Sequence, residues 1–198
     1  GKIPFIVMGS VDRKGDAWAT LLAGRPGFIS SPTPTTLEIG ARPDPTDPAS
    51  EGAQEGDAIA LLGIELHTRR RNRANGVLRA TSGTGLGFEL DQSFGNCPKY
   101  IQLRDVSLVR EADAPFTGDV EESGALDQAA RDMIRAADTF FVASYAERED
   151  RRQVDVSHRG GKAGFVRVAD DGTLTIPDFA GNLFFNTLGN ILLNGKAG

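Results

Sequence analysis

An internal repeat constrains the fold of this chain more than any other feature of its sequence. Three segments recur in the same order, and the last two pairs share an offset of 137 residues. The matched pairs are Phe5–Val7 with Phe140–Val142, Gly24–Ile29 with Gly161–Val166, and Thr36–Ile39 with Thr173–Ile176. A repeat of this length indicates two diverged copies of one structural unit.

The composition of the repeated unit predicts a mainly β fold with a few helices. Six segments of the first copy are rich in β-branched and aromatic residues and are bounded by Gly, Pro and Asp turns. They are residues 4–11, 17–23, 36–40, 58–66, 71–80 and 85–94. Six short strands favour a small barrel, and the 24 glycines and 10 prolines of the chain suit the many turns that such a barrel needs.

The repeat also predicts the domain organisation. Residues 1–110 form the first unit, and residues 111–137 form a linker whose apolar spacing over 124–137 favours an amphipathic helix. Residues 138–198 form a second unit, which stops where the counterpart of the strand 58–66 should begin. Because an open sheet would leave unpaired edges, we expect this chain to be part of a longer polypeptide or to lack its tail. Residues 44–54 are expected to hold a short helix or a loop.

Charge and cysteine content exclude several classes of function. The formal charge of −5 disfavours binding to nucleic acid or to an acidic membrane surface, and no apolar run approaches the length of a membrane helix. The single cysteine, Cys97, cannot form an internal disulfide, which favours the cytoplasm, and it suits buried packing better than nucleophilic chemistry. His67 and His158 do not stand with carboxylates at metal-ligand spacing, so we expect no protein metal site.

Polar residues of the second copy suggest a site for an anion. The segment 155–162 combines a hydroxyl, an imidazole, a guanidinium and an ammonium group with glycines that let a ligand approach the backbone. Asn182, Asn186 and Asn190 recur every four residues and would line one face of a helix that starts within 181–190, whose N-terminal amides suit a phosphate. Asn also caps helices and shapes turns, so a structural role is the alternative, although the three together favour a ligand.

The first copy contributes a basic run. In a strand, Arg69, Arg71 and Arg73 share one face and Arg70 takes the other. Two interpretations fit equally well: a solvated edge strand that charge protects from aggregation, or a site for a phosphate or carboxylate.

The segments 94–100, 155–165 and 176–190 together resemble the pyridoxamine 5'-phosphate oxidase-like flavin-binding split barrels. The similarity is greatest to bacterial proteins with two such units in tandem, some of them fused to a reductase module. The resemblance implies a six-stranded Greek-key barrel in each unit, the second incomplete here at its C-terminus. It also implies flavin mononucleotide (FMN) bound where two barrels meet, with redox chemistry at the isoalloxazine ring.

By position, the resemblance implies that flavin contacts come from two strands of the second unit. The family's usual Ser-Arg-Lys type turn is replaced here by residues 180–182, so other cations must hold the phosphate. The first copy has few donors at the matching places, so the second should supply most contacts while the first closes the pocket. The expected FMN-binding residues are Ser157, His158, Arg159, Lys162, Ile176, Pro177, Asp178, Asn182, Asn186, Thr187 and Asn190 of the second unit, with Arg71 and Lys99 of the first.

These observations predict an FMN-binding flavoprotein that acts as an oxidoreductase between a donor and oxygen, an acceptor or a partner reductase. The alternative is a non-catalytic module that binds flavin, haem or a deazaflavin. We expect a homodimer and name no catalytic acid or base.

Overall fold

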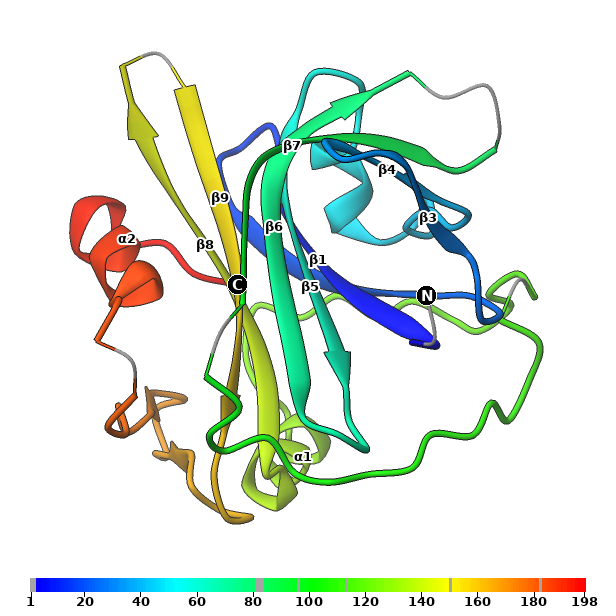
Figure 1. Cartoon of the computed structure of the whole chain (residues 1–198). Helices are drawn as coiled ribbons and strands as arrows, with labels where there is room; N and C mark the ends of the chain where they lie inside the picture. The colour runs from blue at the N-terminus through cyan, green and yellow to red at the C-terminus, as the bar shows by residue number, and fades with distance from the viewer. Residues whose placement is uncertain (1–2, 81–83, 96, 113, 150, 182) are drawn as a thin grey trace.

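The computed structural model describes residues 3–80, 84–95, 97–112, 114–149, 151–181 and 183–198. In this part of the chain the fold is mainly β, with two α-helices and one short 3-10 helix (Figure 1). The elements are β1 (Phe5–Val11), β2 (Ala17–Ala23), β3 (Ile29–Thr33), β4 (Thr36–Ile39), η1 (Pro48–Gly52), β5 (Ala58–Glu65), β6 (Arg70–Arg79), β7 (Leu86–Gly95), α1 (Gln128–Ala136), β8 (Thr139–Arg148), β9 (Arg151–Gly160), β10 (Arg167–Val168), β11 (Leu174–Thr175) and α2 (Asn186–Asn194).

The first seven strands form one antiparallel sheet in the order β2-β1-β5-β6-β7-β4-β3. This sheet contains the six predicted strands and one strand that was not predicted, β3. The β3 sequence is mostly polar and includes Pro32, which lacks an amide hydrogen and is tolerated because β3 lies at the edge of the sheet.

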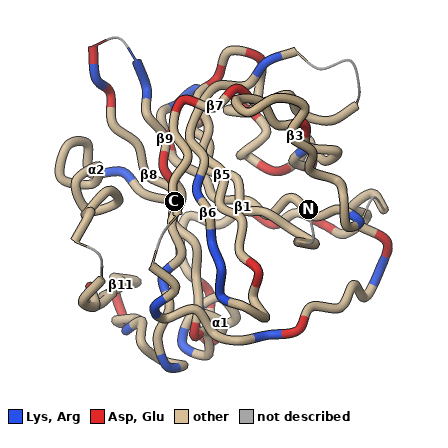
Figure 2. The backbone as a smooth tube through the Cα atoms, viewed as in Figure 1, with Lys and Arg blue, Asp and Glu red and all other residues tan. Residues whose placement is uncertain are grey.

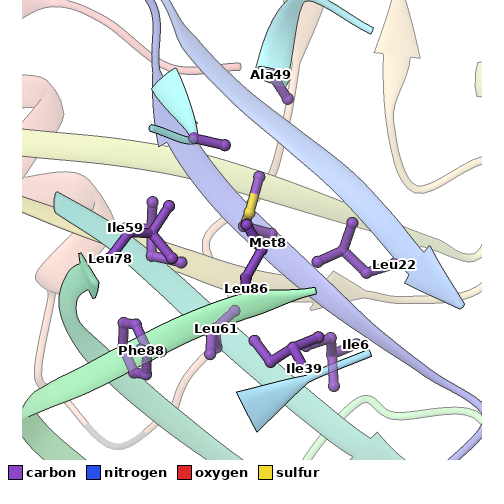
Figure 3. Close-up of a cluster of buried hydrophobic side chains, with 11 residues drawn as sticks. Ile6, Met8, Leu22, Ile39, Ala49, Ile59, Leu61, Leu78, Leu86 and Phe88 are labelled. Carbon is purple, nitrogen blue, oxygen red and sulfur yellow. The ribbon is translucent and has the colours of Figure 1, made fainter. Parts of the chain in front are cut away.

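The sheet curls around a hydrophobic core on the face that we call the inner face. Buried side chains from near both edges, such as Leu22 of β2 and Ile39 of β4, join those of the central strands, such as Leu61 of β5 and Phe88 of β7. Figure 3 shows these side chains converging with Met8. Strands that alternate inward and outward side chains account for this arrangement.

The β8–β9 hairpin packs on the opposite, outer face of the same sheet (Figure 1). Its buried residues Ala143 and Val156 contact the outward residues of β1 and β5, among them Val7 and Leu62. Gly9 sits beneath the hairpin, where a Cβ would meet the Val156 side chain at 3.0 Å. The outer face of the first half therefore provides the surface on which the second half folds.

Local geometry recurs at the repeat offset of 137 residues. Phe28 donates its amide to Arg25 O at 2.9 Å, and Phe165 donates its amide to Lys162 O at 3.0 Å. The pairing of β10 with β11 places Arg167 opposite Thr175, as β3 places Ser30 opposite Glu38. The described second half nevertheless forms two separate two-stranded sheets. The structure therefore does not show the two tandem barrels that the repeat predicted.

The helices lie in the second half and in the segment before it. Asp127 caps α1 by accepting a hydrogen bond from the Ala130 amide at 2.7 Å, so the predicted helix within 124–137 is present. The predicted helix or loop within 44–54 contains η1. No helix in the described ranges is both long and apolar enough to cross a membrane.

Candidate functional site

A pocket of about 170 Å³ lies where the outer face of β6 meets β9 and the chain that leads into α2. Arg71 and Arg73 line it from β6, and the end of β9 contributes residues 157–160. Residues 97, 99 and 100 and the segments 177–181 and 183–188 complete the wall. The basic run of β6 is visible as a blue stretch in Figure 2. Both halves of the chain therefore build the pocket.

Arg73 of the pocket wall also belongs to a buried ion pair between the two halves. Arg73 Nη1 lies 3.2 Å from Asp155 Oδ1, and both side chains are about 5% exposed or less. Arg73 also donates a hydrogen bond to the Ser157 hydroxyl. Burial raises the pKa of Asp155, while the charge of Arg73 acts in the opposite direction. This pair fixes β9 on β6.

Arg71 lies two residues earlier on the same face of β6, as predicted, but it has no ion-pair partner among the described residues. Its Nε atom is buried without a hydrogen bond. Burial and the neighbouring Arg73 lower the pKa of Arg71 to about 10, so the guanidinium is charged at neutral pH. Partial burial of a cation without an ion-pair partner is costly, and an anionic ligand would supply that partner.

His158 forms part of the wall from β9 and is 5% exposed. Burial, and after it the charge of Arg71, lowers the pKa of His158 to about 4. The imidazole is therefore neutral at pH 7, and its Nε2 atom is buried without a hydrogen bond. The ring of Phe141 meets it edge-on with 5.8 Å between centroids.

Arg159 Nη1 forms an ion pair with Asp178 Oδ1 at 2.8 Å. Pro177 and Asp178 line the pocket next to it, while Ile176 does not. Lys99 also lines the pocket. Because Asp178 offsets the charge of Arg159, the cations of the pocket wall that have no ion-pair partner among the described residues are Arg71 and Lys99.

The N-terminus of α2 opens into the same pocket. Phe185 precedes the helix in the left-handed conformation, with φ of 51°, and makes no side-chain capping bond. Asn186 and Thr187, the first two helical residues, line the pocket. A helix N-terminus without a side-chain cap offers free amide donors and a favourable dipole to an anion.

Helix α2 starts at Asn186, later than the asparagine spacing predicted. The asparagine face of the helix therefore has a different role from the one expected. Asn182 lies outside the described residues. Asn190 donates to Ser144 Oγ at 3.1 Å, and Asn194 donates to Tyr145 O at 2.7 Å. The later part of the face therefore attaches α2 to β8. Of the two predicted asparagines that the structure describes, Asn186 lies in the pocket wall and Asn190 does not.

An open, aromatic depression of about 560 Å³ adjoins the pocket. Tyr100, Phe165 and Phe179 line both spaces, and Lys162 lines only the depression. Tyr100 and Phe179 have their ring centroids 5.2 Å apart. The combined site thus has a basic, polar end and an aromatic end.

Sequence reasoning did not include Arg73 or these aromatic residues in the expected site. The strand spacing had nevertheless placed Arg73 on the same face as Arg71, with a phosphate or carboxylate site as one of two interpretations of the basic run. The aromatic residues gave no signal, because their convergence depends on how distant segments fold together. Among the described residues no cluster of three His, Cys, Asp or Glu side chains could hold a metal ion.

Comparisons with known proteins assign no family. No family model matches the chain, and no curated protein matches it. A search of solved structures found a weak similarity to HupZ of Group A Streptococcus, with a TM-score of 0.37 and 10% sequence identity. The match covers 48% of this chain and 91% of that chain.

Proposed function

We propose that the chain is an FMN-binding flavoprotein and that the pocket between β6, β9 and α2 holds the FMN phosphate. The observation that carries the proposal is the partly buried Arg71, whose Nε has no hydrogen-bond partner, beside the N-terminus of α2, which has no side-chain cap. A phosphate satisfies both, because it accepts charge-assisted hydrogen bonds and favours the positive end of a helix dipole.

The shape of the combined site supports a ligand with one anionic and one aromatic end. The polar pocket of about 170 Å³ is below the range of about 300 to 1,000 Å³ that encloses a whole small-molecule ligand. It suits a phosphate, and the adjoining depression with Phe165 and Phe179 suits a flat ring. Lys162 then belongs to the ring end of the site.

Bound flavin would supply hydride or electron transfer, and the protein would orient it and set its potential. The neutral His158 can donate or accept one hydrogen bond at its unpartnered Nε2. The oxidoreductase assignment, a donor, a partner reductase and a homodimer belong to the same proposal. Exposed apolar side chains of the pocket wall, such as Leu183 and Phe184, at 72% and 61% exposure, support a partner there.

A titration of FMN fluorescence tests the proposal. Arg71→Gln should weaken FMN binding about tenfold or more, because a charge-assisted bond contributes about 1.5 to 3 kcal/mol. Arg159→Ala should have a similar effect, because it also leaves the Asp178 carboxylate without its partner in the pocket wall. Arg25→Ala is the matched control, since Arg25 lies at the repeated turn of the first copy and pairs with Glu111 on the surface. Wild-type protein that leaves FMN fluorescence unchanged would refute the proposal, and an equal loss in the control would refute the position of the site.

A flavin-binding module without turnover is the second candidate. The ion pair with Arg159 engages Asp178, a carboxylate of the pocket wall that would otherwise be available for proton transfer. Anaerobic addition of NADPH or NADH separates the two functions. Bleaching of the bound flavin within seconds supports an oxidoreductase, whereas bleaching only after a reductase is added supports a module that receives electrons.

A further inference from the structure

The curled sheet contains a second cavity, mainly on the inner face of β6, which shares Arg73 with the pocket of the candidate site. This inner cavity has a volume of about 320 Å³ and lies next to the core at Ile6 and Leu61. Its apolar wall also includes Ile29, Leu37 and Leu90. Side chains normally fill the interior of a small barrel-like sheet, so an open space of this size needs an explanation.

Two inward positions of the cavity wall carry small residues, and the Ile3 side chain packs beside one of them, since a Cβ at Gly63 would meet it at 3.0 Å. Gly63 of β5 and Ala74 of β6 both line the cavity. Their cross-strand partners are Asn72 and Leu61, respectively, so neither cross-strand pair consists of two bulky apolar side chains. The volume is at the lower end of the range for pockets that bind small molecules, about 300 to 1,000 Å³.

The rim of the cavity carries one cation and one carboxylate, and no ion pair joins them. Glu65 and Arg70 are cross-strand partners at the mouth, but Glu65 Oε2 accepts a hydrogen bond from the Thr68 hydroxyl at 3.0 Å. Among the described residues, Arg70 forms no ion pair, and its side chain is exposed. The cavity thus combines an apolar interior with a cation at its entrance.

We propose that the inner cavity is a second binding site, which takes a small apolar monocarboxylate with its hydrocarbon part among Ile6, Leu61 and Leu90 and its carboxylate at Arg70. Arg70 and Arg71 are consecutive and face opposite sides of β6. Arg73 lines both spaces, but its charge is paired with Asp155. The strand therefore presents to each site one arginine that has no ion-pair partner among the described residues. The proposal does not depend on flavin binding.

Isothermal titration calorimetry with octanoate and octanol tests this site on the whole chain. Both ligands should bind, with methyl resonances of Leu61 and Ala74 shifting in NMR spectra. Arg70→Gln should weaken octanoate about two- to fivefold, as expected for an exposed ion pair, and should leave octanol unchanged. The control Arg69→Gln alters the neighbouring residue, which does not line the cavity, and should affect neither ligand.

Ala74→Leu fills the cavity and should abolish binding of both ligands. If this variant does not fold, the difference between octanoate and octanol in Arg70→Gln still decides the question. Absence of binding to the wild type, an equal effect of Arg70→Gln on both ligands, or unchanged binding in a folded Ala74→Leu would each overturn the proposal.

Discussion

The buried, neutral His158 makes stability depend on pH in a way that can be calculated. Its pKa is about 4 in the folded chain and 6.5 in an exposed histidine. The unfolded chain therefore binds the proton more tightly, and the stabilisation present above pH 6.5 is lost as the pH falls through 4. Linkage gives a loss of about 2 kcal/mol at pH 5 and about 3 kcal/mol at pH 4 from this residue.

Other groups titrate in the same window, so the contribution of His158 must be isolated with a variant. Asp155 acts in the opposite direction, because its raised pKa favours the folded state as the pH falls. His158→Gln keeps a polar, neutral side chain and removes only the titration. Urea unfolding of both proteins between pH 7 and 4 gives the difference in unfolding free energy.

The wild type should lose about 3 kcal/mol relative to His158→Gln over this range. A difference that is constant with pH would refute the assignment of a buried, neutral imidazole. If the unfolding free energy of the wild type instead rises relative to that of His158→Gln at low pH, the folded chain must stabilise the protonated imidazole. That result would contradict the contacts described above.

Two further variants test how the second half is held. Arg73→Met should cost about 3 to 5 kcal/mol of unfolding free energy at pH 7, because it leaves Asp155 buried without its cation. Urea unfolding of the double variant Arg73→Met/Asp155→Leu should show that much of this loss is recovered. Additive effects of the two substitutions would show that the pair is not coupled. Asp127→Ala should destabilise α1 by about 1 kcal/mol, measured as faster amide hydrogen exchange over 128–136, and unchanged exchange would exclude the cap at Ala130.

The sequence predicted most strands of the sheet because their burial follows from local composition. Alternation of apolar side chains is visible in β1 and β5, where Ile6, Met8, Ile59 and Leu61 point inward. The edge strand β3 was missed because its polar residues and proline give no such pattern. The repeat alone could not establish a second barrel. Similar local sequences predict similar turns, but they do not determine whether β8 and β9 pair with other strands.

The candidate site was predictable in its residue types but not in its assembly. The cations on β6 and β9 were visible as a pattern, whereas their meeting depends on the hairpin packing against the outer face. The start of α2 was misplaced because the asparagine spacing extended upstream of Phe185, whose left-handed conformation precedes the helix. Asn190 then serves packing, through Ser144, which is the structural alternative that the sequence left open.

The pocket walls come from parts of the chain that are far apart, and this has a consequence for folding kinetics. Arg73 and Ser157, which both line the pocket, are 84 residues apart, and Tyr145 binds the Gly15 carbonyl across 130 residues. Contacts of such long range require the closure of large loops and form slowly. The first sheet can therefore fold before the hairpin docks, and a ligand at the pocket would bind only after this last step. Ligand binding would then slow unfolding by holding the hairpin in place, with little effect on the rate at which the first sheet forms.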